Sequence, residues 1–193
     1  MIDNLLNLVR ENAGEAIFNN PDIPNDRNEE AVQETTSSLV SGLQGILAQG
    51  GVKDLLGMFN SGGVDNSNPV VQNLSGGLIG NLVNKFGLDS GKAGSLVSSL
   101  LPMVLNQLIS RTKNPADNGF SLDGLFGQLS GGRTQGMNIE AIAGKLAGGG
   151  MDKDGDGDVD LQDLMGIFTG GGNSGNSNQG GSPLDALKGI FGN

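Results

Sequence analysis

The chain has 193 residues, among them 35 glycines and no cysteine, histidine, tryptophan or tyrosine, and its net charge is −10. The absence of thiols and imidazoles excludes disulfides, thiolate nucleophiles and the commonest general base, so few residues suited to catalysis are left. The excess of acidic residues argues against nucleic acid and anionic membrane surfaces as partners.

The first third of the chain predicts two helices. Residues 3–18 place apolar side chains at helical spacing behind Asp3, which is the expected N-cap. A longer helix is expected to begin near Asn28 and to carry two glutamates in its first turn. The N-terminal residues do not resemble a secretory leader, so we expect a cytoplasmic protein, with export by a non-classical route as the alternative.

Two more helices are predicted in the middle of the chain. Asn68 and Pro69 are a typical helix start, and Gly87 is a typical end. The next helix, around residues 96–109, is the most apolar and is the expected core helix. Pro102 lies inside it and predicts either a kink or a helix start close to that residue. No run of about 18 apolar residues suggests a membrane span.

Beyond residue 112 the sequence changes to short apolar stretches separated by glycines. The fold class predicted for the whole chain is all-α, a multihelical bundle followed by short Gly-rich helices and one EF-hand-like loop. The predicted parts are a helical bundle at 1–112, short Gly-rich helices at 113–169, a flexible linker at 170–182, and a short amphipathic helix at 183–193.

A five-residue unit recurs in which two apolar residues flank a central glycine. The units are Leu43-Gly45-Leu47, Leu55-Gly57-Phe59, Leu78-Gly80-Leu82, Leu125-Gly127-Leu129, Ile142-Gly144-Leu146, Leu164-Gly166-Phe168 and Leu187-Gly189-Phe191. On a helix the two apolar side chains of each unit lie on one side. The glycine, which has no side chain, lies on the opposite side. One interpretation is that the units result from compositional bias. The other is that the glycines let these short helices stack closely on one another, within the chain or between copies. The second interpretation predicts self-association.

Residues 152–163, "DKDGDGDVDLQD", follow the pattern of an EF-hand calcium loop. Gly157 stands at the sixth position, where the loop turns sharply, and Asp158 supplies a backbone carbonyl at the seventh. The carboxylates at the first, third, fifth, ninth and twelfth positions are those of Asp152, Asp154, Asp156, Asp160 and Asp163. The cofactor predicted is therefore calcium (Ca²⁺), and the alternative is an acidic, solvated linker.

The twelfth position carries Asp163 where an EF-hand usually has glutamate. The shorter side chain favours weaker binding or tolerance of Mg²⁺. In this respect the loop is similar to the calcium loops of dockerin repeats, which occur in twos, whereas one loop is present here. A lone loop can pair with the same loop of another copy, which again predicts that the partner is the protein itself.

Residues 1–130 resemble the YidB-like bacterial family of unknown function, particularly its Bacteroidota-type members. The resemblance rests on "DNLLNLVRENAGEAIFNNPDIPN" and on "NPVVQNLSGGLIGNLVNKFGLDSGKAGSLVSSLLPMVLNQLISRT". It implies a helical bundle and no established activity, and it assigns no functional residues.

The function expected from the sequence is a non-enzymatic, calcium-binding, self-associating helical protein without a small-molecule substrate. An adaptor that binds another protein or a membrane surface through short amphipathic helices is the alternative, and a hydrolase is a remote one. The stretch "GLDSGKAGS" fails as a phosphate-binding loop because Ala93 stands where that loop needs serine or threonine, and no strand is predicted before it.

Overall fold

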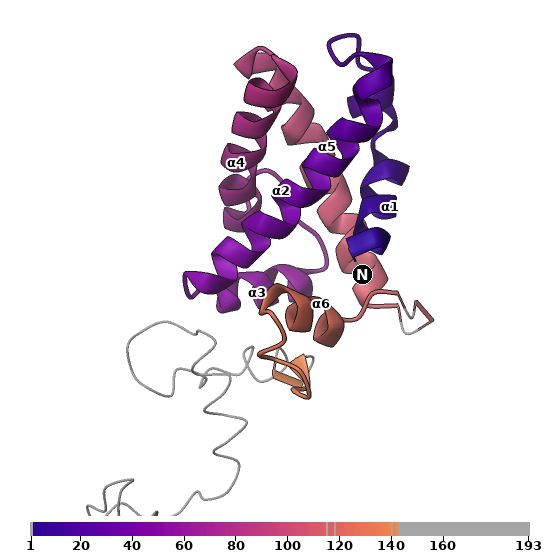
Figure 1. Cartoon of the computed structure of the whole chain (residues 1–193). Helices are drawn as coiled ribbons and strands as arrows, with labels where there is room; N and C mark the ends of the chain where they lie inside the picture. The colour runs from indigo at the N-terminus through magenta and orange to yellow at the C-terminus, as the bar shows by residue number, and fades with distance from the viewer. Residues whose placement is uncertain (1, 115, 118, 140, 143–193) are drawn as a thin grey trace, which may run out of the picture.

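The computed structural model describes residues 2–114, 116–117, 119–139 and 141–142 (Figure 1). Its elements are α1 (Ile2–Asn12), a π-helical turn (Gly14–Phe18), a 3-10 turn (Asn25–Arg27), α2 (Asn28–Ala48), α3 (Val52–Ser61), α4 (Pro69–Phe86), α5 (Ser90–Thr112) and α6 (Leu122–Leu129). No strand occurs within these ranges, which confirms the all-α prediction for them. The elements predicted after residue 142 lie outside the described residues.

Four helices form a closed bundle around one apolar core. α2 packs against α1 and α4, and α5 packs against the same two helices from the other side. α3 and α6 are shorter and lie across one end of the bundle (Figure 1). The buried apolar side chains of all six helices belong to a single cluster.

The ends of α4 and α5 follow from local chemistry. The Asn68 side chain accepts a hydrogen bond from the Val70 N–H at 2.9 Å, and Gly87 ends α4 with φ of 69°. Asp89 caps α5 by accepting from the Gly91 N–H at 2.9 Å. The predicted start and end of α4 are therefore confirmed.

The first helix differs from its prediction at both ends. Asp3 lies inside α1 and is not its N-cap, and α1 ends at Asn12. The chain then widens into the π-helical turn, in which the Asn19 N–H donates to the Gly14 carbonyl at 2.9 Å. Ala13 and Ile17 are both fully buried. Helical spacing also places these two residues, four apart, on one face, so the spacing predicts their burial but not the widening of the turn.

α5 runs unbroken from Ser90 to Thr112, so it does not begin at Pro102. Proline has no N–H, which leaves the carbonyl of Ser98 without its helical partner. The Asn66 side chain donates to that carbonyl at 3.0 Å. Among the described helices, α5 alone is long and apolar enough to cross a membrane by length and composition, and half of that stretch is buried inside the bundle.

A second asparagine fixes the same loop on α5. Asn106 accepts from the Val64 N–H at 2.7 Å and donates to the Val64 carbonyl at 2.9 Å. We expect Asn106→Ala to lower the free energy of unfolding by about 1–3 kcal/mol, because both backbone groups lose their partner. Gln107→Ala, at an exposed neighbouring position, is the control and should change it by less than about 0.5 kcal/mol. Urea unfolding followed by circular dichroism measures both, and equal effects would contradict this role.

Candidate functional site

The residues predicted to bind calcium lie outside the part of the chain that the structure describes. They are Asp152, Asp154, Asp156, Asp158, Asp160 and Asp163. Within the described ranges, no group of three or more acidic side chains could hold a metal ion. The loop at 152–163 therefore remains the candidate metal site on the grounds of its spacing.

The recurring unit behaves as predicted on its apolar side. Four units lie wholly among the described residues, and both apolar side chains of each are buried: Leu43 and Leu47, Leu55 and Phe59, Leu78 and Leu82, and Leu125 and Leu129. These units lie in α2, α3, α4 and α6. The two apolar side chains of each described unit therefore pack one side of its helix against the core of the bundle.

The expectation that the unit glycines permit close helix packing within the chain is wrong for the described units. A Cβ atom added at Gly57 or Gly80 would meet nothing within 4 Å. At Gly45 and Gly127 the nearest atoms belong to glutamine side chains, at 3.8 and 3.9 Å. Of the four glycines, Gly57 is exposed, Gly45 and Gly80 are partly buried, and Gly127 is itself buried.

Close approach occurs instead at Gly42, where an added Cβ would lie 2.3 Å from the Cδ2 atom of Leu74. This contact marks where α2 and α4 come together. Beside it runs a groove of about 600 Å³, lined by Glu34, Ser37, Ser38, Ser41, Gly42, Gly45, Gln49, Asn73, Leu74, Gly77, Asn81 and Lys85. Eight of these twelve residues are serine, glycine or asparagine.

One end of this groove holds a chain of hydrogen bonds between α2 and α4. Lys85 forms an ion pair with Glu34, whose side chain is only 11% exposed. The Ser38 hydroxyl donates to Glu34 at 3.3 Å, and the Asn81 amide donates to Ser38 at 2.8 Å. Glu34 is the one carboxylate in the groove lining, so no pair of acids converges there. The arrangement joins two helices and provides no acid–base pair.

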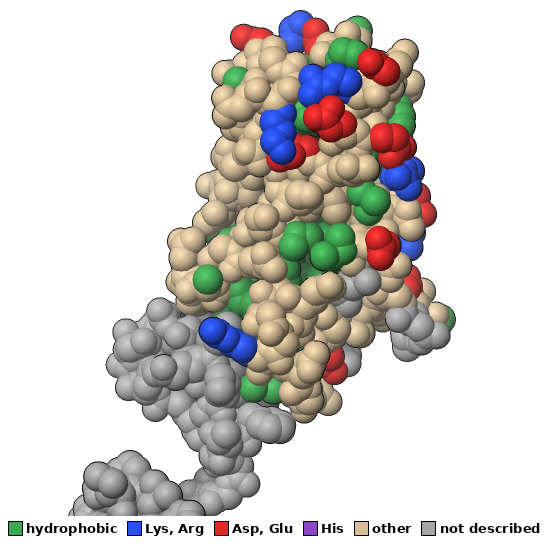
Figure 2. Space-filling model, viewed as in Figure 1, with side chains coloured by type: hydrophobic (Ala, Val, Ile, Leu, Met, Phe, Trp, Pro, Cys, Tyr) green, Lys and Arg blue, Asp and Glu red, His purple; other side chains and the backbone are tan. Residues whose placement is uncertain are grey.

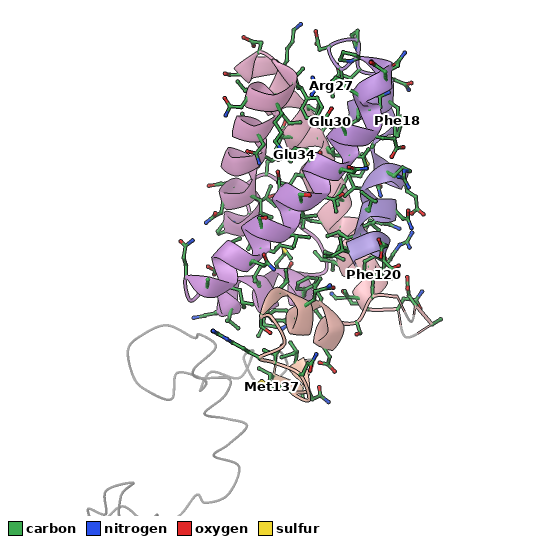
Figure 3. The ribbon with its side chains drawn as sticks, viewed as in Figure 1. Phe18, Arg27, Glu30, Glu34, Phe120 and Met137 are labelled. Atoms are coloured by element: carbon green, nitrogen blue, oxygen red, sulfur yellow. The ribbon has the colours of Figure 1, made fainter. Side chains whose placement is uncertain are left out.

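Arg27 extends this network toward the start of α2. It binds Glu30 at 2.9 Å, donates to the Lys85 carbonyl at 3.0 Å, and lies 4.5 Å from the centre of the Phe86 ring. The hydrogen bond from Arg27 lowers the pKa of Glu30. Figure 3 shows Arg27, Glu30 and Glu34 in succession down one side of the bundle. The pair of Arg27 and Glu30 is local, three residues apart, whereas the bond from Arg27 to the Lys85 carbonyl joins positions 58 apart and has no signal in the sequence pattern.

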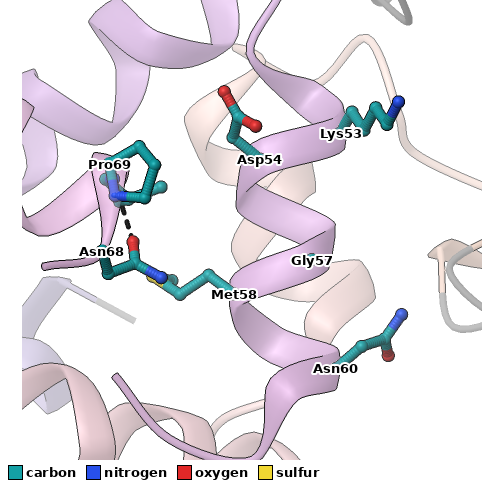
Figure 4. Close-up of a pocket in the computed structure, with 8 residues that line it drawn as sticks. Lys53, Asp54, Gly57, Met58, Asn60, Asn68 and Pro69 are labelled. Atoms are coloured by element: carbon teal, nitrogen blue, oxygen red, sulfur yellow. Dashed lines mark hydrogen bonds between the residues drawn. The ribbon is translucent and has the colours of Figure 1, made fainter. Parts of the chain in front are cut away.

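A second hollow, of about 440 Å³, lies between α3 and the start of α4 (Figure 4). Lys53 and Asn60 extend from one side of α3 and Asp54 from the other, so the charged groups do not converge. The side chain of Asn68 is engaged in capping α4. This hollow therefore lacks the arrangement of a catalytic site.

The third feature is a small apolar cleft where α1, α2 and α6 meet. Its volume is about 20 Å³, which accommodates the end of one side chain, and it is lined by Ile2, Leu5, Val40, Leu43, Leu125, Gln128 and Leu129. Ile2 is 50% exposed at its rim. Figure 2 shows hydrophobic side chains open to solvent in the middle of this face, below the half where charged side chains gather. Most of its lining residues are buried, so the cleft is a small apolar opening at the junction of three helices.

Comparison with known proteins leaves the resemblance to YidB-like proteins as an expectation. No family model, curated protein or solved structure matches the chain.

Proposed function

We propose that the protein is a non-enzymatic, calcium-binding, self-associating helical protein. The observation that carries the calcium proposal is the spacing of residues 152–163, with five carboxylates at the ligand positions and Gly157 at the turn. Oxygen ligands in this order suit a hard cation such as Ca²⁺. The bundle serves as the scaffold to which the loop is attached.

Calcium would act by removing charge repulsion. Without a cation, the six carboxylates within residues 152–163, five of them at ligand positions, repel one another, which opposes a compact loop. A bound Ca²⁺ reverses this effect, so binding and ordering of the segment occur together. The helix that leaves the loop, starting near Leu164, is then held in place and can offer its apolar side to a partner.

Hydrogen exchange of the full chain in CaCl₂ and in EGTA tests this proposal. We expect calcium to protect amides around residues 152–168 and to leave those of α2, α4 and α5 unchanged. The double variant Asp154→Asn with Asp156→Asn should lose this protection. Asp26→Asn with Asp54→Asn, which removes two carboxylates from the bundle, is the matched control and should retain it. Equal protection in both solutions would refute the proposal.

Self-association is supported by the open space beside Gly57 and Gly80, the unit glycines of α3 and α4. A glycine in a helix interior costs up to about 1 kcal/mol relative to alanine, and at Gly57 and Gly80 no neighbour within the described chain uses the space. A helix of a second copy could approach the helix surface at Gly57 and Gly80 closely, because no side chain projects there. We therefore expect Gly80→Gln to weaken assembly.

Sedimentation velocity measures this effect. Gly94→Gln is the control, because Gly94 also faces open space but lies on α5 and outside the units. Loss of large species in Gly80→Gln alone would support an interface at the unit. A protein that sediments as a monomer at all concentrations, with and without calcium, would refute self-association.

A further inference from the structure

One side of α4 has the same arrangement of residues when it is read in either direction. It carries Asn73, Gly77, Gly80 and Asn84, with asparagine at both ends and glycine at both central positions. Their intervals of four, three and four residues keep them on one line along a helix, as in the seam of a coiled coil. Asn73, Gly77 and Asn84 are exposed, and Gly80 is partly buried. We call these four residues the α4 seam.

The space over the centre of the α4 seam is open. A Cβ atom added at Gly77 or Gly80 would meet nothing within 4 Å. The groove of about 600 Å³ between α2 and α4 runs along one flank of the seam and includes Gly77 in its lining. The α2 side of the groove consists largely of small residues, namely Ser37, Ser38, Ser41, Gly42 and Gly45. A helix from outside the described chain can therefore approach α4 closely here.

The surface around the seam carries almost no charge. Residues 35–49 of α2 and the turn after it, and residues 69–84 of α4, contain no charged side chain. The first charges met at one end, Glu34 and Lys85, are paired with each other. Each chain has a net charge of −10, so two copies repel one another over much of their surfaces. The centres of protein interfaces are depleted of charge, and this surface has that property.

We propose that two copies of this chain pair through their α4 seams, antiparallel and related by a two-fold axis between Gly77 and Gly80. The inference rests on the proposed self-association and names its surface. About such an axis every contact occurs twice, with the two residues exchanged. Gly77 then lies opposite Gly80 of the second copy, and Asn73 lies opposite Asn84 of the second copy. An asparagine amide both donates and accepts, so the facing asparagines can hydrogen-bond to each other.

The symmetry of the seam favours a second copy over an unrelated partner. A helix that pairs with itself in antiparallel register requires matching residue types at symmetric positions, whereas a different partner imposes no such requirement.

The size of the surface is that of a weak dimer. α4 has 18 residues and is therefore about 27 Å long. Together with the flank of α2 across the groove, the contact is about 20 Å wide, which gives about 540 Å² per copy and about 1,100 Å² in total. Specific interfaces begin at about 1,000–1,200 Å². We therefore expect a dimer that forms at high protein concentration.

Single cysteines test the pairing, because the chain contains none. Full-length Asn73→Cys and Asn84→Cys are mixed, treated with a short bismaleimide cross-linker, and analysed for covalent dimer on denaturing gels. In the antiparallel pair residue 73 faces residue 84, whereas equivalent residues lie about 16 Å apart along the helix. We expect several times more covalent dimer in the mixture than with either variant alone. Ser99→Cys mixed with Ser110→Cys, two exposed positions at the same sequence separation on α5, is the matched control and should show no excess.

Sedimentation velocity provides an independent measurement. Gly77→Gln places a side chain in the seam and should weaken the dimer by about tenfold or more. The effect should be equal in CaCl₂ and in EGTA, because the seam lies outside the proposed calcium loop. Circular dichroism verifies that each variant is folded.

The outcomes separate this surface from self-association in general. If the native protein self-associates but the mixture gives no more covalent dimer than the single variants, pairing through α4 is refuted and self-association stands. Association that disappears in EGTA would assign it to the calcium loop and also refute the seam. A native protein that is monomeric at every concentration, with and without calcium, refutes both.

Discussion

Replacing Phe126 by alanine is expected to lower the free energy of unfolding by about 3–5 kcal/mol. The Phe126 side chain is fully buried, and its ring packs edge-on against that of Phe59, with centroids 6.3 Å apart. The substitution removes this contact and leaves a cavity where α3 and α6 close the bundle. Domains of this size have a total stability of roughly 5–15 kcal/mol, so the loss is a large fraction of it.

Urea unfolding at constant temperature measures this effect. Leu122→Ala is the matched control, because Leu122 lies on the same helix and is only partly buried against the core. We expect it to cost about 1 kcal/mol. A cost for Phe126→Ala no greater than that of the control would show that α6 does not pack on the bundle as described.

The second large effect is expected at Gly51, in the turn between α2 and α3. A Cβ added there would lie 2.5 Å from the Ile46 Cγ2 atom and 2.9 Å from the Ile46 carbonyl oxygen. The carbonyl belongs to the backbone, and it also accepts the Gly51 N–H at 2.9 Å. Gly51→Ala must therefore displace the turn, and we expect it to lower the free energy of unfolding by about 1–3 kcal/mol.

Gly57→Ala provides the opposite expectation within the same helix. Gly57 lies inside α3, and an added Cβ meets nothing within 4 Å. Alanine there reduces the conformational freedom of the unfolded chain, so we expect the free energy of unfolding to rise by about 0.5–1 kcal/mol. Thermal unfolding of the two variants side by side tests the assignment. Two changes of the same sign would contradict it.

Helices with strong local signals could be predicted from the sequence. The start and end of α4 followed from Asn68, Pro69 and Gly87, because capping depends on residues within one turn. The apolar sides of the units were also predicted correctly, since burial follows helical spacing. The π-helical turn was missed because Ala13 and Ile17 have the spacing of an ordinary α-helix, so the pattern carries no sign of the wider turn.

Features that depend on distant residues could not be predicted. The contact between Glu34 and Lys85 joins positions 51 residues apart, and the one between Asn66 and Ser98 joins positions 32 apart. The apolar cleft needs three helices to exist. The candidate calcium loop is different, because all of its proposed ligands lie within one continuous segment and their spacing can be recognised without a fold.

Titration calorimetry of the full chain with CaCl₂, repeated on the variant that carries Asp154→Asn and Asp156→Asn, tests the proposed metal site most directly. The account predicts saturable heat with one Ca²⁺ per chain for the native sequence and none for the variant. A native protein that produces no heat of binding, or a variant that binds as well as the native chain, would contradict a calcium site at residues 152–163.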